Sequence, residues 1–185
     1  MKKKGKVILT AEQMSRVIER LCFQLIEHHQ DFSKTCMVGI QQKGVLLAAR
    51  LVKRINELTG HTIESGKLDI TFFRDDFRQG NRILNAHETD IDFLIEGKKL
   101  ILVDDVLYTG RTIQAALQAM QQFGRPAKVE LLVLIDRRFN RHIPIQADYI
   151  GLKVDALDQA YVKVEWKEDG IEDKVLFFDA ERQNV

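Results

Sequence analysis

The chain has 185 residues, 45% of them hydrophobic, so it can bury a core and fits a single domain spanning residues 1–185. Its 28 basic and 27 acidic residues give a formal net charge of +1, which excludes a global positive field that would drive nucleic-acid binding. The sequence holds no run of 18 apolar residues, so we predict no membrane span. Cys22 and Cys36 lie in apolar runs without metal-ligand spacing, which is typical of reduced core residues in a cytoplasmic protein.

The first predicted helix follows Thr10, which can form a capping box with Gln13. Apolar residues at helical spacing continue this helix to His28, and His29 comes next. Because adjacent residues do not share a face of a helix, we expect the two histidines to complement the C-terminal helix dipole and not to bind a metal together.

A second unit combines the short apolar strand Cys36–Ile40, the turn Gln41–Gly44 and a helical pattern over Val45–Leu58. Such a turn can bind an anion through its backbone N–H groups and Lys43. A plain connection between strand and helix, with a solvated lysine, fits the same residues equally well. A third predicted strand, Lys67–Phe73, alternates and is rich in residues that favour strands.

The centre of the chain combines a strand, an acidic pair, a turn and a helix. The apolar run Leu100–Val103 predicts a strand buried on both faces of a parallel sheet, followed by Asp104 and Asp105. The turn Thr109–Thr112 then leads into the helical pattern Ile113–Met120. Ligands of open α/β sheets bind at the carboxyl ends of the strands, so we expect a ligand here.

The chemistry of this stretch favours a phosphorylated sugar bound with magnesium. Unpaired N–H groups at a helix start, with the hydroxyls of Thr109 and Thr112, suit a phosphate. The carboxylates of Asp104 and Asp105 would repel that phosphate, but they suit sugar hydroxyls or a divalent cation. The alternative is an ordinary strand end whose aspartates cap the helix.

Beyond the centre, Val129–Ile135 predicts another buried strand that ends in Asp136 and Arg137. Two alternating runs, Tyr161–Trp166 and Lys174–Phe178, predict a hairpin. The predicted fold class is therefore α/β, with a doubly wound, mainly parallel sheet, helices on both faces and a small C-terminal β segment.

The run Val103–Thr112, Val-Asp-Asp-Val-Leu-Tyr-Thr-Gly-Arg-Thr, resembles the phosphoribosyl pyrophosphate (PRPP) signature of type I phosphoribosyltransferases. Its specific form is similar to that of the bifunctional pyrimidine operon attenuation and uracil phosphoribosyltransferase family. The resemblance continues through Asp69–Asp76, Gly124–Pro126, Leu134–Arg137, Ile143–Ile145 and Ala147–Gly151.

The resemblance implies the type I phosphoribosyltransferase fold and transfer of ribosyl phosphate from PRPP to uracil, giving UMP and pyrophosphate with Mg2+ as cofactor. It implies that Asp104 and Asp105 are catalytic and hold the ribose hydroxyls, directly or through water and Mg2+. Arg137, also taken as catalytic, would donate to a carbonyl oxygen of the base. A polar segment, Phe77–Gly97, would form a flexible hood, in which Arg78 and Arg82 either reach the ligand on closure or remain solvated.

Three groups of binding residues follow from the resemblance. They are Val103, Asp104, Asp105, Val106, Leu107, Tyr108, Thr109, Gly110, Arg111 and Thr112 for PRPP and its phosphate; Gln41, Gln42, Lys43, Gly44 and Arg74 for pyrophosphate; and Arg137, Tyr149, Ile150 and Gly151 for the base. The chain departs from the family at Lys43, where the family usually has arginine, and after Gly151, where Leu152–Leu157 replaces a run that lines the base pocket. Purine-specific relatives usually carry an acidic residue where this chain has Tyr108, which favours a pyrimidine.

Three other functions stay open. The attenuator family also binds messenger RNA when loaded with UMP, but the basic candidates here, Lys2–Lys4, Arg137, Arg138 and Arg141, are few, so RNA is the less favoured partner. A phosphoribosyltransferase for another base and an inert interaction domain are the remaining alternatives. We expect a homo-oligomer without membrane contact.

Overall fold

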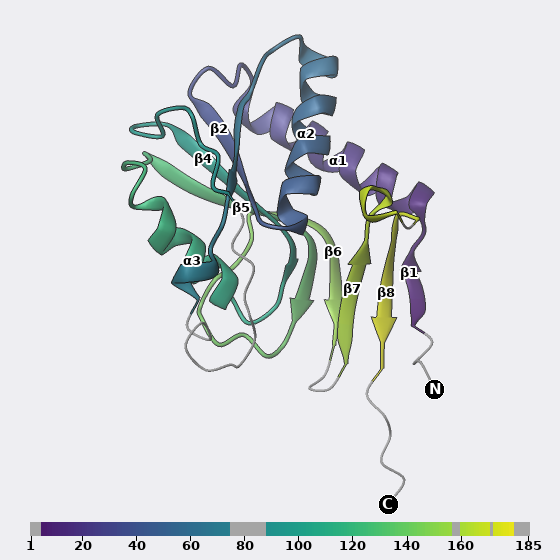
Figure 1. Cartoon of the computed structure of the whole chain (residues 1–185). Helices are drawn as coiled ribbons and strands as arrows, with labels where there is room; N and C mark the ends of the chain where they lie inside the picture. The colour runs from purple at the N-terminus through teal and green to yellow at the C-terminus, as the bar shows by residue number, and fades with distance from the viewer. Residues whose placement is uncertain (1–4, 75–87, 157–159, 171, 180–185) are drawn as a thin grey trace, which may run out of the picture.

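The computed structural model describes residues 5–74, 88–156, 160–170 and 172–179, which form two β-sheets and three α-helices (Figure 1). The larger sheet is parallel, in the order β3-β2-β4-β5-β6. Its strands are β2 (Thr35–Ile40), β3 (Glu64–Leu68), β4 (Lys99–Leu107), β5 (Lys128–Arg138) and β6 (Tyr149–Asp155). The smaller sheet is antiparallel, in the order β1-β8-β7, with β1 (Lys6–Leu9), β7 (Tyr161–Glu165) and β8 (Lys174–Phe178).

Helices cover both faces of the parallel sheet. On one face lie α1 (Ala11–His29) and α2 (Lys43–Thr59), and α3 (Arg111–Met120) covers the other (Figure 1). Side chains of β4 alternate between the two apolar clusters: Ile101 and Val103 pack with α1 and α2, and Leu100 and Leu102 pack with α3. Both faces of the sheet are thus covered, which confirms the predicted doubly wound sheet. A strand buried on both faces needs apolar residues at every position, as the run Leu100–Val103 has.

The N-terminal helix begins as predicted. The hydroxyl of Thr10 accepts the N–H of Gln13 at 3.3 Å, and the side-chain oxygen of Gln13 accepts the N–H of Thr10 at 2.9 Å, which completes the capping box. Cys22 and Cys36 are free and fully buried, which confirms that they are core residues.

The predicted strand over Lys67–Phe73 is wrong in its position. β3 ends at Leu68, and a short 3-10 helix, η1 (Thr71–Phe73), follows it. One carboxylate oxygen of Asp69 accepts both the backbone N–H and the hydroxyl of Thr71, at 2.9 and 2.6 Å, and this local pairing turns the chain out of the sheet. The alternation of apolar residues carried no sign of that turn.

The predicted hairpin is confirmed, since β7 and β8 pair antiparallel, and it gains a third strand that the sequence did not reveal. That strand, β1, is too short to show a period. A second 3-10 helix, η2 (Lys167–Asp169), lies between β7 and β8. Arg50 of α2 holds this region through paired hydrogen bonds to Glu168 and Asp173 and lies 4.7 Å above the ring of buried Trp166.

The expected hood falls partly outside the described residues, which omit 75–87 and with them Arg78 and Arg82. Residues 88–98 contain no helix or regular strand, and Asp90 forms an isolated bridge to Lys67. Among the helices that the structure describes, none has the length and hydropathy needed to cross a bilayer.

Candidate active site

The acidic pair lies at the carboxyl edge of the parallel sheet, as predicted. β4 runs to Leu107, further than the sequence indicated, so Asp104 and Asp105 lie within the strand, close to its carboxyl end. Asp104 pairs in register with Val133 of β5. The chain then passes through a short turn and enters α3 at Arg111. Strand, acidic pair, turn and helix therefore follow in the predicted order, with the helix beginning two residues earlier than expected.

The two carboxylates carry an electrostatic cost. Burial raises the pKa of Asp104 well above its ordinary range, and the negative charge of Asp105 raises it further. One oxygen of Asp104 accepts the N–H of Asp105 at 2.9 Å. Burial also raises the pKa of Asp105, against the ammonium of Lys43, which lowers it. Two like charges held in this environment are a place for hydroxyl donors or a cation.

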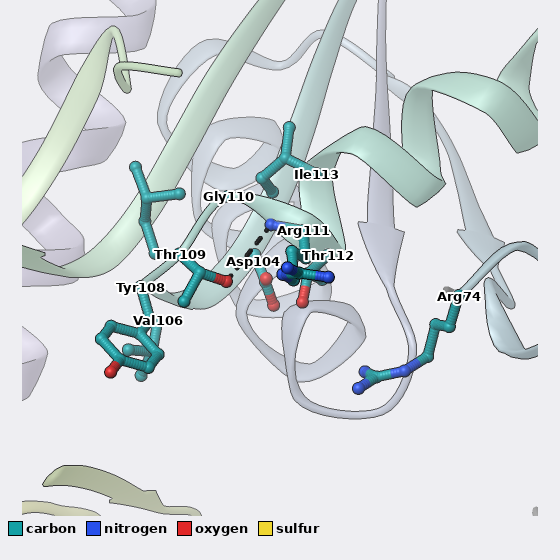
Figure 2. Close-up of a pocket in the computed structure, with 10 residues that line it drawn as sticks. Arg74, Asp104, Val106, Tyr108, Thr109, Gly110, Arg111, Thr112 and Ile113 are labelled. Atoms are coloured by element: carbon teal, nitrogen blue, oxygen red, sulfur yellow. Dashed lines mark hydrogen bonds between the residues drawn. The ribbon is translucent and has the colours of Figure 1, made fainter. Parts of the chain in front are cut away.

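The turn before α3 has the geometry of an anion site. Gly110 is the N-cap at φ +90° and has no side chain with which to cap the helix. A Cβ at Gly110 would lie 3.1 Å from the Cβ of Ile143 in a conformation that favours glycine, so this position has room only for glycine. The hydroxyl of Thr109 accepts the N–H of Arg111 at 3.4 Å (Figure 2). The start of α3 thus presents backbone donors and hydroxyls beside the acidic pair.

A pocket of about 260 Å³ opens on this turn. Its lining residues are Arg74, Asp104, Val106, Leu107, Tyr108, Thr109, Gly110, Arg111, Thr112 and Ile113. Figure 2 shows that Arg74 comes from a separate segment, the residues after η1, on the side away from Tyr108. The structure therefore brings together the predicted phosphate turn, one of the acidic pair and Arg74.

The segment after β5 holds this turn in place, a contact that sequence reasoning missed. The carbonyl of Thr109 accepts the N–H groups of His142 and Ile143, at 2.9 and 3.0 Å. Arg141 donates to the carbonyl of Tyr108 and, at 2.6 Å, to the carboxylate of Asp136. Arg141, one of the basic candidates for RNA, is thus an internal positioning residue, and no spacing in the sequence signals this.

The turn Gln41–Gly44 packs directly against the acidic strand. A Cβ at Gly44 would lie 2.4 Å from the carbonyl oxygen of Val103 and 3.0 Å from the Cα of Asp104, so only glycine allows this approach. Since α2 begins at Lys43, the last two residues of the predicted turn are helical. The side-chain nitrogen of Lys43 donates to the carbonyl of Val164 in β7, which ties this predicted pyrophosphate loop to the smaller sheet.

Arg137 is the second-last residue of β5, at the carboxyl end as expected, and is 5% exposed. Its guanidinium carbon lies 3.6 Å from the ring centre of Tyr108. Two of its nitrogens, Nε and Nη2, are buried and have no hydrogen-bond partner among the described residues. A buried guanidinium in this state needs an acceptor, which a carbonyl oxygen of a ligand can supply.

The predicted base-binding residues Tyr149, Ile150 and Gly151 lie at the amino end of their strand. They begin β6, which runs parallel to β5, so Tyr149 pairs with Leu132 and lies well before the level of Arg137. The hydroxyl of Tyr149 donates to Glu130 at 3.0 Å, toward the opposite edge of the sheet. The residues of β6 that pair with the end of β5 are Val154 and Asp155. Since ligands bind at the carboxyl ends of parallel strands, these two residues are the part of β6 nearest to the site.

The acidic pair also fits a magnesium ion by its donor chemistry. Mg2+ prefers carboxylate oxygens and water and is commonly bound by one or two carboxylates together with phosphate groups of a substrate. The raised pKa of Asp104 has burial as its first cause, and a nearby divalent charge would offset that burial. The residues present therefore suit the cofactor that the sequence predicts.

Comparison with known sequences identifies one family. The model of the family described as "Phosphoribosyl transferase domain" matches residues 5–169. "Bifunctional protein PyrR" of Elusimicrobium minutum is 40% identical over 170 residues, covering 92% of this chain and 94% of that protein. The protein of the same name from Caldicellulosiruptor bescii is 40% identical over 180 residues, covering 97% and 98%.

Solved structures support the fold. A hypoxanthine phosphoribosyltransferase from Staphylococcus aureus superposes with a TM-score of 0.67 at 21% identity and covers 97% of this chain and 94% of its own. The corresponding enzyme of Trypanosoma cruzi gives a TM-score of 0.72 at 15% identity, with coverage of 96% and 93%. At such identities the likeness concerns architecture and leaves the choice of base to the site itself.

Proposed function

This chain belongs to the phosphoribosyl transferase domain family, and we propose that it transfers ribosyl phosphate from PRPP to uracil, giving UMP and pyrophosphate. One observation carries the proposal: buried Asp104 and partly buried Asp105 lie near the end of β4, and the short turn that follows leads into the start of α3 with Gly110 as its N-cap. Carboxylates for ribose hydroxyls beside donors for a phosphate are the two halves of a phosphorylated sugar site.

In this proposal, Asp104 and Asp105 accept hydrogen bonds from the ribose hydroxyls and fix the sugar for attack at its anomeric carbon. Thr109, Thr112 and the first N–H groups of α3 bind the 5-phosphate. Mg2+, when bound, neutralises charge on the leaving pyrophosphate. Gly110 and the contacts of Arg141 keep the turn rigid, which supplies preorganised donors and avoids an ordering cost at each turnover.

The base site is proposed at Arg137 and Tyr108. The unpartnered nitrogens of Arg137 would donate to a carbonyl oxygen of uracil and stabilise the ring anion that forms as N1 loses its proton. The ring of Tyr108 lies against that guanidinium, where purine-specific relatives usually have an acidic residue. The contact supports a pyrimidine, because Tyr108 is committed to stacking and offers no carboxylate for a purine nitrogen.

The pyrophosphate site is proposed at Gln41, Gln42, Lys43, Gly44 and Arg74, a set supported by the contact of Gly44 with the acidic strand and by the place of Arg74 in the pocket. The ammonium of Lys43 donates to the carbonyl of Val164. Because an ammonium carries three N–H donors, Lys43 could also donate to the leaving group, which would link β7 to the pyrophosphate site.

We also propose that the chain works as one domain in the cytoplasm. The apolar cluster on the α1 and α2 face includes Leu132 of the parallel sheet together with Val164 and Val175 of the smaller sheet, which supports one shared core. The two free buried cysteines are consistent with a reducing compartment.

Product analysis tests the enzyme directly. Purified protein is mixed with PRPP, Mg2+ and uracil, and nucleotide and pyrophosphate are measured together. We expect one UMP and one pyrophosphate per uracil consumed, and no UMP when ribose 5-phosphate replaces PRPP. Release of pyrophosphate without UMP would mean that the chain hydrolyses PRPP and would overturn the transfer reaction.

A UMP-responsive RNA-binding regulator is the second candidate, because relatives at 40% identity are named as bifunctional proteins. Two of its expected basic residues are engaged within the chain: Arg138 pairs with Asp155 at 2.6 Å, and Arg141 pairs with Asp136. Filter binding to leader RNA of pyrimidine genes, with and without UMP, separates the two. Sub-micromolar, UMP-dependent binding would support the regulator. Non-specific affinity of about 10⁻⁴ to 10⁻⁶ M would leave the enzymatic function as the only one supported.

A further inference from the structure

A second cluster of ligand-type side chains lies at the other edge of the sheet. His28 and His29 end α1, and Glu130 lies near the start of β5. The Nε2 atom of His28 is 3.4 Å from one oxygen of Glu130, and Nε2 of His29 is 2.9 Å from the other. Although adjacent helical residues do not share a face, both rings reach one carboxylate, which lies between them.

We propose that His28, His29 and Glu130 bind a divalent transition-metal ion of the zinc class. Nitrogen and oxygen ligands lie about 2.0–2.2 Å from Zn2+, so two ligands in a tetrahedral site are about 3.3–3.6 Å apart. The three ligand atoms here all lie within 4.8 Å of one another, so small side-chain movements bring them to that spacing. Two histidines and one glutamate leave a fourth position for water.

The surroundings hold the ligands in the orientation that a metal needs. The hydroxyl of Thr35 lies 3.2 Å from Nδ1 of His29, which directs Nε2 toward Glu130. Tyr149 donates to the carboxylate of Glu130 at 3.0 Å. The side chains of His29 and Glu130 are 0% and 1% exposed, and the side chain of His28 is 50% exposed, which gives an ion a path from solvent.

The site already attracts a cation. The ammonium of Lys128 lies 2.6 Å from the Glu130 oxygen that faces His28, and its side chain is 53% exposed. A metal ion would displace this lysine into solvent, where its long side chain can reach water at little cost. Lys128 therefore competes with the metal, and removing it should strengthen binding while removing a ligand should weaken it.

Titration of tag-free protein with Co2+ and Zn2+ tests the proposal, by visible absorption and calorimetry. We expect one site in the wild-type chain, with affinity lowered at least about 10–100-fold in His28→Ala, the magnitude that losing even an indirect contact costs. Lys128→Ala should bind more tightly than the wild type. His61→Ala removes an exposed histidine that approaches Phe32 and lies outside the cluster, so it should bind like the wild type.

Each outcome decides the matter. The proposal fails if wild-type protein takes up neither ion, if His28→Ala binds as well as the wild type, or if His61→Ala loses binding equally. Tighter binding by Lys128→Ala together with loss in His28→Ala would establish the site. His28 is half-exposed, so its replacement should leave the fold intact, and circular dichroism of each variant checks this.

Discussion

Buried ionisable groups occur at both edges of the parallel sheet, and the pKa of the buried carboxyl is shifted in opposite directions at the two edges. At the amino edge, burial of Glu130 raises its pKa, but hydrogen bonds from Lys128 and Tyr149 lower it overall. At the carboxyl edge, the pKa of Asp104 rises well above its ordinary range through burial and the charge of Asp105. One edge supplies partners for its carboxylate, and the other holds two carboxylates against each other.

This difference separates stability from function. A paired buried carboxylate supports the fold, because removing it strands its partners. Two carboxylates that repel each other cost folding free energy, and such a cost is kept where a ligand relieves it. Variants at the carboxyl edge should therefore lose turnover, and variants at the amino edge should lose stability.

The largest effect is expected from Asp104→Asn combined with Asp105→Asn. Turnover should fall at least about 10³-fold, the upper end of what the loss of one preorganised contact costs, because two such groups are removed. The melting temperature should hold or rise, because the substitution removes a buried like-charge pair. Steady-state kinetics and thermal unfolding measure the two. Glu27→Gln, at an exposed position of α1, is the matched control and should change neither. Retained turnover in the double variant would remove the acidic pair from the site.

Glu130→Ala should show the reverse pattern. Loss of the carboxylate leaves the buried His29 and Tyr149 without their acceptor, and the free energy of unfolding should fall by about 3–5 kcal/mol. Turnover of the folded protein should stay close to that of the wild type. Denaturant unfolding in the presence of a chelator measures the loss without any metal contribution.

Glu57→Ala serves as the control for that variant, since Glu57 forms a surface pair with Arg54 at 3.3 Å. Its loss should cost no more than about 1 kcal/mol. Equal destabilisation by the two substitutions would show that the amino-edge cluster contributes nothing special to the fold.

Arg137→Ala should weaken uracil binding by about 10–100-fold, the cost of losing hydrogen bonds to a charged group. Affinity for PRPP should fall by much less, because the donors of Thr109, Thr112 and the first N–H groups of α3 remain in place. Arg137→Lys keeps the charge but lacks the planar fork of the guanidinium, so its affinity for uracil should lie between those of the wild type and Arg137→Ala. Calorimetry with each ligand measures the split, and a greater loss for PRPP than for uracil would move Arg137 out of the base site.

The smallest effect is a pH dependence of stability. A carboxyl whose pKa is raised on folding binds more protons in the folded than in the unfolded state, so stability falls as pH rises from about 4 through the raised pKa. Asp104→Asn with Asp105→Asn should remove that fall and gain stability over the wild type as the pH increases. Unfolding temperatures at pH 5 and pH 7.5 give the comparison, and parallel profiles for both proteins would contradict the raised pKa.

The sequence predicted those parts of the fold that local patterns encode. The buried run of β4, the capping box at Thr10 and the hairpin of β7 and β8 each follow from periodicity or a short motif. β1 and the early end of β3 were missed, because pairing with β8 and the side-chain contacts of Asp69 leave no periodic sign.

The site was predictable where it is contiguous in the chain. The acidic pair and the turn to Thr112 come from one stretch, and Arg137 from the end of a strand. The role of Arg141 and the convergence of His28 and His29 on Glu130 depend on residues about 30 and 100 positions apart, and only packing brings them together. The position of Tyr149 along β6 likewise follows from the pairing of β5 with β6, which a motif in the sequence does not give.

The choice of base tests the account most directly. The purified chain is assayed with PRPP and Mg2+ against uracil, hypoxanthine and guanine, first singly and then in competition. If Arg137 and Tyr108 form a pyrimidine site beside the acidic pair, uracil is converted to UMP and the purines give little or no nucleotide. Faster conversion of hypoxanthine or guanine than of uracil would contradict the account.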